Sequence, residues 1–220
     1  MRDFTDITVV LDRSGSMQSV KEATVSGFDE FVQSQKLKGD NASLTLIQFD
    51  DQYDVVWNGL PISSVPTIAG LYQPRSMTAL LDAIGRAIND TGARLAKMHE
   101  RDRPNKVIMV ILTDGLENAS REFDSIKINE MIKRQESDYN WSFIFLGANQ
   151  DAIATATNLG IKPGWAADYS ASSSGTKKSF GKMSDKVAQY RCCSSDLEAV
   201  SFAGNNKLWT EEDREDLTSE

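Results

Sequence analysis

The sequence contains few of the residues on which many enzymes and most secreted domains depend. Its 220 residues include a single histidine, His99, and two cysteines, the neighbours Cys192 and Cys193. A disulfide between adjacent residues is strained and closes no useful loop, so we expect both thiols to be reduced, as in the cytoplasm. His99 lies beside Glu100 and Arg101, and we expect it to be a solvated surface group.

The parts of several common active sites are also missing. A serine nucleophile needs an adjacent base, and neither a G-x-S-x-G elbow nor a P-loop is present. A phosphoryl-transfer enzyme would need a second acid two residues after a nucleophilic Asp12, and Ser14 occupies that position. We therefore expect the protein not to be an enzyme.

Long hydrophobic runs and an excess of positive charge are absent as well. No segment approaches the ~20 apolar residues that span a bilayer, and the short apolar run after Arg2 and Asp3 does not resemble a signal peptide. The 24 basic and 32 acidic residues give a net charge of −8 and a pI near 4.8. We expect neither a nucleic acid nor a membrane as partner, and the composition leaves the oligomeric state open.

What is present is an alternation of strand and helix patterns with enough hydrophobic residues, 40%, for a full core. This alternation predicts an α/β three-layer sandwich with a mainly parallel sheet. The turn Asp50-Asp51-Gln52 predicts a hairpin, and hence one antiparallel edge strand. Strand-like segments are 7–11, 44–49, 53–57, 106–112, 141–147 and 165–170, and helical patterns begin near residues 20, 78, 124, 151 and 176.

The last part of the chain differs in composition, so we predict a domain over 1–191 and a polar, acidic C-terminal tail over 192–220. The Ser-rich run 172–175 is predicted to be a flexible turn before the last helix. Residues 209–220 carry six acids against Arg214, a net charge of −5. We expect a loosely attached tail, with a short helix capped by Thr210 and Asp213. One hypothesis is that an acid of this tail competes with a partner at the site described next.

The most informative motif follows the first strand-like segment. The run Asp12-Arg13-Ser14-Gly15-Ser16-Met17 places a carboxylate and two alternating hydroxyls directly behind an apolar strand. Hard cations such as Mg²⁺ take oxygen ligands, and the D-x-S-x-S spacing puts three such oxygens on one side of a tight loop. Taken alone, the motif favours an ordinary helix-capping turn.

Two further residues stand where a metal would need them. Thr78 lies at the start of a predicted helix, and Asp114 follows the buried-type strand 106–112. Because ligands of open α/β sheets bind outside the carboxyl ends of the strands, we predict that Asp12, Ser14, Ser16, Thr78 and Asp114 converge. A calcium loop is excluded, since it needs glycine sixth and glutamate twelfth, where Met17 and Ala23 stand.

These five positions, with Leu112-Thr113-Asp114-Gly115 and the segment 78–84, resemble the von Willebrand factor type A (VWA) domain and its complete metal-ion-dependent adhesion site. The resemblance runs from about residue 5 to about residue 191 and is nearest to stand-alone intracellular bacterial or phage members. It implies a Rossmann-like, doubly wound sheet of six strands and a bound Mg²⁺ or Mn²⁺. It also implies that Ser14, Ser16 and Thr78 ligate the metal directly, while Asp12 and Asp114 act through coordinated water.

The resemblance implies a binding module whose metal captures an Asp or Glu side chain of a partner protein. Alternatives are an accessory subunit of an AAA+ or other multiprotein assembly and, less favoured, a metal-dependent hydrolase. Six neighbouring residues have two equal alternatives, either contact with a partner or no role beyond completing the loop. They are Arg13, Met17, Arg75, Ser76, Glu117 and Asn118. The acids Asp50, Asp51 and Asp54 are expected to form a solvated turn.

Overall fold

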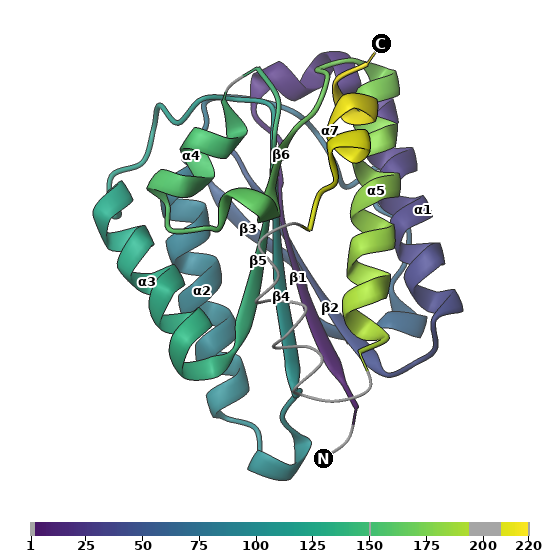
Figure 1. Ribbon diagram of the computed structural model, residues 1–220, viewed down its shortest axis with the longest axis vertical. Coiled ribbons are helices and arrows are strands. Elements are labelled where there is room, and N and C mark those ends of the chain that lie inside the picture. Colours follow the sequence, from purple (N-terminus) through teal and green to yellow (C-terminus); the bar gives the residue numbers. More distant parts are fainter. Residues whose placement is uncertain (1–2, 150, 194–207, 220) are drawn as a thin grey trace.

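A computed structural model describes residues 3–149, 151–193 and 208–219 and shows a three-layer α/β sandwich (Figure 1). Its six-stranded sheet has the order β3-β2-β1-β4-β5-β6. All neighbouring strands are parallel except β2 and β3, which are antiparallel at one edge. This confirms the predicted fold class. The strands are β1 (Thr5–Asp12), β2 (Ala42–Phe49), β3 (Tyr53–Pro61), β4 (Lys106–Thr113), β5 (Trp141–Gly147) and β6 (Ala166–Asp168).

Helices cover both faces of the sheet. On one face lie α1 (Lys21–Leu37) and α5 (Ser173–Arg191), and on the other lie α2 (Leu80–Ala96), α3 (Ser125–Tyr139) and α4 (Ala152–Asn158) (Figure 1). Short 3-10 helices are η1 (Gly15–Val20), η2 (Ile62–Ser64), η3 (Glu100–Asp102) and η4 (Pro163–Trp165). None of the described helices has both the length and the apolar character that crossing a membrane requires.

The central strands are buried along their whole length, as their unbroken apolar runs predict. Every residue of β1, β2, β4 and β5 is buried, whereas the edge strand β3 is partly exposed. The α1–α5 layer is packed closely, because a Cβ atom on Gly27 would lie 2.6 Å from the Phe180 ring. Burial of this extent makes the sheet a rigid platform.

The register of the sheet aligns the strand ends that carry polar residues. Asp12 pairs with Phe49 of β2, and Leu11 pairs with Leu112 of β4. The loops after β1, β2 and β4 therefore leave the sheet side by side at its carboxyl edge. This is the edge at which a doubly wound sheet binds its ligands.

The start of α5 differs from the prediction. The Ser-rich run 172–175 is not a flexible turn: the Ser172 hydroxyl caps the helix by accepting the Gly175 N–H at 3.0 Å. Gly175 is required for close packing, since a Cβ there would lie about 2.1 Å from the Ser170 carbonyl oxygen. Composition indicates a turn here, but the capping serine and the packed glycine begin a helix instead.

The acidic C-terminal segment also differs from the prediction, because residues 208–219 are packed against the domain. The helix α7 (Glu211–Thr218) begins with the predicted capping box of Thr210 and Asp213. Trp209 and Leu217 are almost fully buried, and the Ser170 N–H donates to the Leu217 carbonyl at 2.9 Å. The tail boundary at residue 192 stays a prediction, because residues 194–207 lie outside the described chain.

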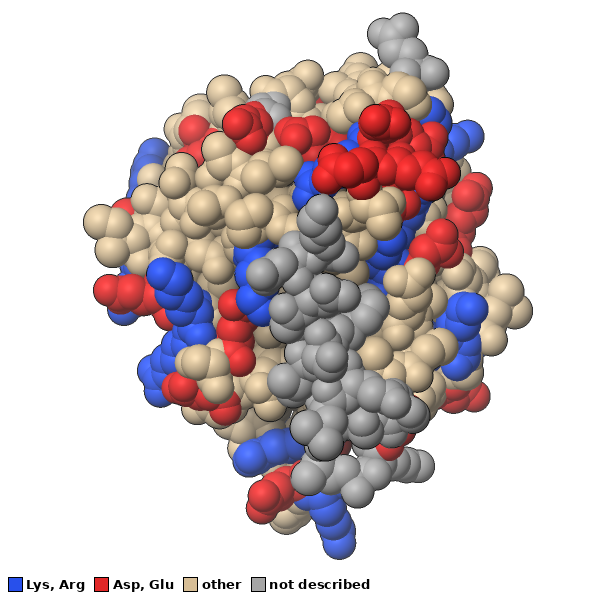
Figure 2. Space-filling model, in the orientation of Figure 1, with Lys and Arg blue, Asp and Glu red and all other residues tan. Residues whose placement is uncertain are grey.

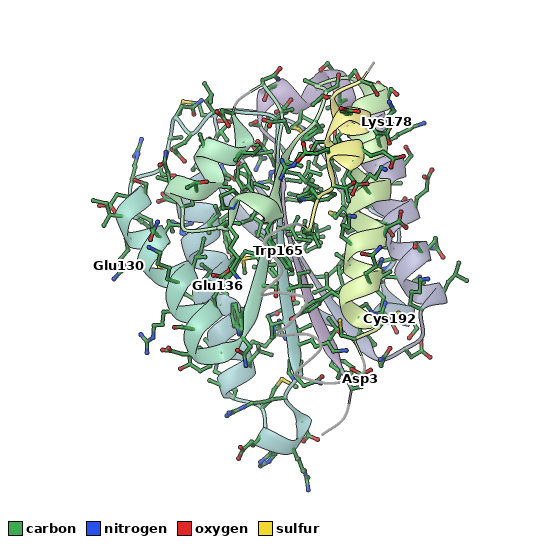
Figure 3. All side chains as sticks on the ribbon, in the orientation of Figure 1. Asp3, Glu130, Glu136, Trp165, Lys178 and Cys192 are labelled. Atoms are coloured by element: carbon green, nitrogen blue, oxygen red, sulfur yellow. The ribbon has the colours of Figure 1, made fainter. Side chains whose placement is uncertain are left out.

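Charge complementarity holds α7 against α5. Lys186 and Lys182 contact the Asp213 carboxylate at 2.7 and 2.9 Å, and Lys182 and Lys178 contact Asp216 at 3.4 and 3.5 Å. The three lysines recur at helical spacing on one face of α5. Figure 2 shows acidic side chains gathered over α7 with basic ones beneath, and Figure 3 places Lys178 at this junction.

Replacing Asp213 with Asn should lower the free energy of unfolding by about 2 kcal/mol at pH 7, because Lys182 and Lys186 would lose their shared carboxylate. Glu215→Gln is the matched control, since it removes the same charge from an exposed position of α7. Urea unfolding measures both variants, and equal effects would contradict this docking.

The same pair of variants has a defined pH dependence. Burial acts to raise the pKa of Asp213, but Lys186 and Lys182 outweigh it and hold that pKa well below its ordinary value. A carboxylate with a lowered native pKa stabilises the fold above its unfolded pKa and loses that effect as the pH falls. The difference between wild type and Asp213→Asn should therefore be largest near neutral pH and shrink below about pH 4.

Candidate functional site

The loop after β1 is organised around the carboxylate of Asp12. This residue has no exposed surface. One carboxylate oxygen accepts the Ser14 N–H at 2.6 Å, and the other accepts the Thr113 hydroxyl at 2.5 Å. The Tyr72 hydroxyl donates to the Asp12 carbonyl at 2.6 Å. The end of β1 is thereby fixed to the end of β4 and to the loop before α2.

The other four predicted site residues meet directly outside this carboxylate. The hydroxyl oxygens of Ser14 and Ser16 lie 3.1 Å apart, and Ser16 donates to Asp114 at 2.5 Å. A Cβ atom on Gly115 would lie 2.8 Å from the Thr78 hydroxyl oxygen and 3.4 Å from those of Ser14 and Ser16. Three hydroxyl oxygens from two loops therefore lie around one small space beside Gly115, which a side chain at that position would occupy.

This arrangement fits the donor preference of a small hard cation. Three neutral hydroxyls and two carboxylates are all oxygen donors, which Mg²⁺ and Mn²⁺ accept. Among the described residues, no group of three or more His, Cys, Asp or Glu side chains is arranged to hold a metal ion, so a metal held here would depend on hydroxyl groups. The residues that could hold it are the five that the sequence predicts: Asp12, Ser14, Ser16, Thr78 and Asp114.

Burial raises the pKa of both carboxylates in the cluster. Burial raises the pKa of Asp12 to about 6, although hydrogen bonds from Thr113 and Ser14 oppose the rise. Burial likewise raises the pKa of Asp114, against the hydrogen bond from Ser16. The site therefore holds negative charge that its own donors do not fully balance, which favours a cation.

An ion-pair network centred on a buried carboxylate lies beside the cluster, and the sequence reasoning missed it. Asp50 is fully buried, and its carboxylate binds Arg13 at 3.1 Å and Arg75 at 2.7 Å. Burial acts to raise the pKa of Asp50, but hydrogen bonds from Arg75, Gln52 and Arg13 outweigh it and lower that pKa. The expectation of a solvated turn is wrong for Asp50. No local signal indicates it, because the partners lie 37 and 25 residues away.

Two other neighbours have clear positions. Met17 is fully buried in the core, so it is not a surface contact residue. Arg13 is buried and its guanidinium also contacts Asp54 at 2.6 Å. Both side chains therefore support the loop from within.

Backbone hydrogen bonds tie the site loops to one another. The Gly15 N–H donates to the Ser76 carbonyl at 3.0 Å, and the Arg75 N–H donates to the Arg13 carbonyl at 2.8 Å. Ser76 has a positive φ of 60°, a conformation that non-glycine residues adopt rarely and mostly at functional loops. The loop after β1 and the loop before α2 thus form one unit.

A second set of bonds joins Thr78 to the loop after β4. The Thr78 N–H donates to the Asn118 side chain at 2.9 Å, and the Asn118 N–H donates to the Thr78 carbonyl at 3.0 Å. The Glu117 carboxylate accepts the Leu81 N–H at 3.0 Å at the start of α2. Glu117 and Asn118 therefore fix the relative position of Thr78 and Asp114.

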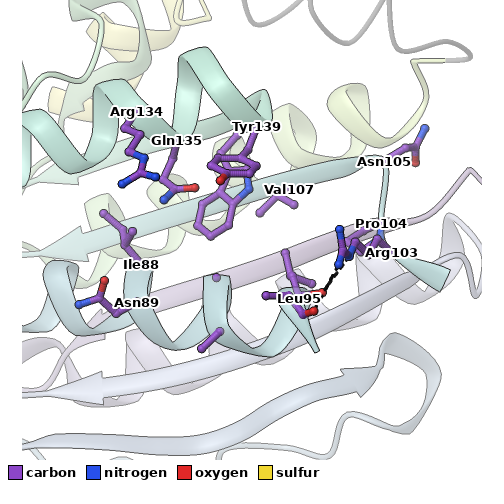
Figure 4. A pocket seen from close by; sticks show the side chains of 14 residues that line it. Ile88, Asn89, Leu95, Arg103, Pro104, Asn105, Val107, Arg134, Gln135 and Tyr139 are labelled. Carbon is purple, nitrogen blue, oxygen red and sulfur yellow. Dashed lines mark hydrogen bonds between the residues drawn. The ribbon is translucent and has the colours of Figure 1, made fainter. Parts of the chain in front are cut away.

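A separate cavity of about 490 Å³ lies between α2 and α3, at the opposite end of the sheet from these loops (Figure 4). Its charged side chains are already engaged. Arg103 donates to the Leu95 carbonyl at 3.2 Å, and Arg134 pairs with Asp138 at 3.6 Å. The lining of this cavity includes none of the five predicted site residues, so the cavity is not part of the candidate site.

The fold is a doubly wound α/β domain with oxygen-rich loops at the carboxyl ends of its central strands, the edge at which ligands of such domains bind. A family model of the von Willebrand factor type A domain matches residues 6–183, and the chain belongs to this family. Domains of this family commonly mediate protein–protein interaction and generally bind a divalent metal. No curated protein matches the sequence.

Solved structures share the fold at low sequence identity. The pilus adhesin SpaC from Lactobacillus rhamnosus GG has a TM-score of 0.63 and 16% identity, over 84% of this chain and 30% of that chain. A von Willebrand factor type A protein from Catenulispora acidiphila has a TM-score of 0.60 and 14% identity, over 84% and 42%. Proximal thread matrix protein 1 from the mussel byssus, with a zinc-occupied metal-ion-dependent adhesion site, has a TM-score of 0.54 and 15% identity, over 86% and 46%. The chain spans less than half the length of each.

The raised pKa of Asp12 predicts how the metal-free protein responds to pH. Its native pKa is above the unfolded value of 3.8, so the native state binds more protons than the unfolded state between these values, and stability falls as the pH rises through about 6. In EDTA at pH 7.5, the free energy of unfolding of Asp12→Asn should be higher than that of wild type by on the order of 3 kcal/mol. The gain should disappear near pH 4.

Urea unfolding at both pH values measures this difference. Asp51→Asn is the control, because Asp51 is an exposed acid near the same loops. The free energy of unfolding of this variant should equal that of wild type at both pH values. Parallel pH profiles for wild type and Asp12→Asn would contradict the buried, unbalanced carboxylate.

Proposed function

We propose that the chain is a divalent-metal-dependent protein-binding module that uses Mg²⁺, or Mn²⁺, to capture an acidic side chain of a partner. The space beside Gly115, surrounded by three hydroxyl oxygens, carries this proposal. The zinc in the same type of site of the mussel protein supports it. SpaC, which shares the fold, is a pilus adhesin, and this fits a binding role.

Each site residue has a role in the proposal. Ser14, Ser16 and Thr78 ligate the metal directly, and all three are neutral. Asp12 and Asp114 orient these hydroxyls and hold coordinated water, as ligand-supporting carboxylates commonly do. A metal with no carboxylate among its direct ligands supplies a strongly electrophilic position, which favours a carboxylate from the partner.

The proposal excludes catalysis as the main function. His99 is exposed and lies past the end of α2, so it offers no base to Ser14 or Ser16. The alternative is an accessory subunit of an AAA+ or other multiprotein assembly, in which the same site recruits a client. A metal-dependent hydrolase is less favoured. Cys192 and Cys193 are not joined in a disulfide, which supports a cytoplasmic setting for a bacterial or phage protein.

Calorimetric titration with Mn²⁺ tests the metal site. Asp12→Ala should abolish the binding heat, and Gly115→Ala should weaken it strongly, because the added Cβ would occupy the space beside the Thr78 hydroxyl. Asp51→Ala, an exposed acid outside the cluster, should bind as wild type does. Heats equal to wild type for Asp12→Ala would contradict the assignment.

Affinity capture in Mg²⁺ and again in EDTA tests the binding function. Proteins retained by wild type in Mg²⁺ should be absent in EDTA and absent from Asp12→Ala, provided that circular dichroism shows the variant folded. The same retained proteins in all three samples would contradict a metal-dependent module. Screening for phosphatase and esterase activity tests the hydrolase alternative.

A further inference from the structure

We propose that the buried carboxylate of Asp50 is a positioning residue of the metal site, and that through Arg75 it sets how tightly the site binds its metal. The inference rests on the proposed function and extends it beyond the five predicted site residues. Asp50 supplies no ligand to the metal. It acts by fixing the two loops that carry the three hydroxyl groups, those of Ser14, Ser16 and Thr78.

The first contact of Asp50 is with the loop after β1. Its Oδ2 atom accepts the Arg13 Nε–H at 3.1 Å, and Arg13 directly precedes Ser14. The backbone of Arg13 is bonded as well, because its N–H donates to the Phe49 carbonyl at 2.8 Å and its carbonyl accepts the Arg75 N–H at 2.8 Å. This one residue is therefore fixed at three points, which restricts the position of the adjoining Ser14.

The second contact of Asp50 is with the loop that leads into α2. The same Oδ2 atom accepts the Arg75 Nε–H at 2.7 Å, so a single carboxylate oxygen joins both loops. The Asp50 carbonyl accepts the Ala79 N–H at 2.8 Å, and Ala79 directly follows Thr78. Asp50 therefore holds the second loop by its side chain before Thr78 and by its main chain after it.

The Asp50 carboxylate is itself held in place. Its other oxygen, Oδ1, accepts the Gln52 N–H at 2.6 Å, and the Asp50 N–H donates to the Gln52 carbonyl at 3.0 Å. The Gln52 side-chain oxygen accepts a second hydrogen bond from Arg75, at 2.8 Å from Nη2. Asp50 has no exposed surface, and a hydrogen-bonded ion pair is stronger where the local dielectric is low. The two guanidinium groups thus have a fixed acceptor.

Hydroxyl ligands on two separate loops make metal binding sensitive to the position of those loops. Mg²⁺ requires nearly ideal octahedral geometry, which the three hydroxyls meet only if the loops keep their relative position. The Gly15 N–H joins the loops by donating to the Ser76 carbonyl at 3.0 Å, and Ser76 has the uncommon φ of 60°. Such a conformation persists only where the surrounding contacts impose it. The adjoining Arg75, bound to Asp50, supplies one such contact.

Charge and position lead to opposite expectations for Arg75. Its side chain is 50% exposed, so we expect the fold to tolerate its replacement. Arg75→Gln removes a positive charge near the cation, and Coulomb repulsion alone would then leave metal binding unchanged or make it tighter. If Asp50 positions the loops through Arg75, the same variant binds metal more weakly. The expected loss is about tenfold, at the lower end of the effect of residues that support metal ligands.

Calorimetric titration of the full chain with Mn²⁺, at low and at high salt, measures this loss. Arg75→Gln should bind about tenfold more weakly at both salt concentrations, because salt screens exposed charges and not loop geometry. Asp50→Asn should lose at least as much affinity. The double variant should bind no more weakly than Asp50→Asn, because both substitutions break the same contact. Arg134→Gln is the matched control, since it removes an exposed, ion-paired arginine at the opposite end of the sheet, and it should bind as wild type does.

Amide hydrogen exchange in EDTA supplies a readout that involves no metal. The Gly15 and Ala79 N–H groups form the main-chain bonds of the two loops, so both should exchange faster in Arg75→Gln than in wild type. The Val9 amide, inside the buried strand β1, should keep its rate, because local loosening of the loops does not open the core. Asp213→Asn controls for lost stability, and it should bind Mn²⁺ as wild type does because it lies outside the site.

The outcomes separate this inference from the proposed function. Unchanged or tighter Mn²⁺ binding by Arg75→Gln, or additive losses in the double variant, would overturn the positioning role and leave the metal site intact. Equally weak binding by Asp213→Asn would overturn it as well, since lost stability would then explain the effect. If Asp50→Asn does not fold, Arg75→Gln alone decides. Failure of wild type to bind Mn²⁺ would overturn the proposed function itself.

Discussion

The carboxylate of Asp12 ends the central strand with no exposed surface, and the surrounding loops are built to meet that constraint. A buried carboxylate is costly unless donors compensate it. Ser14 and Thr113 donate to it directly, and Tyr72 fixes the adjacent carbonyl. These donors compensate it incompletely, because burial still raises the pKa of Asp12 to about 6. The remaining charge favours a cation beside it, so one constraint explains both the loop structure and the proposed metal site.

The loops at the candidate site are joined to one another by ion pairs and hydrogen bonds. Asp50 binds both Arg13 and Arg75, which belong to the loops after β1 and before α2. A carboxylate shared by two guanidinium groups fixes direction as well as distance. Thr78 and Asn118 extend the linkage to the loop after β4. These links connect all three loops that carry the five predicted site residues.

The sequence predicts the features that depend on local pattern and misses those that depend on distant partners. Buried strands are visible as unbroken apolar runs, and the site residues are visible because each follows or faces a strand end. The buried Asp50 is invisible, since its arginines lie far away in the chain. Ser172 and Gly175 resemble a turn by composition, but packing against Ser170 makes them the start of a helix. The metal role of the cluster stays a prediction that its geometry supports.

The docked acidic helix bears on competition at the metal. Two acids of the C-terminal segment, Asp213 and Asp216, bind lysines of α5, so neither reaches the metal without breaking those contacts. Lys186 also lies over the buried Trp209 ring, 5.7 Å from its centroid, which adds apolar and cation–π contact to the ion pairs. Undocking would expose that ring along with the charges. The docking of α7 therefore argues against Asp213 and Asp216 as the tail acids that the competition hypothesis requires.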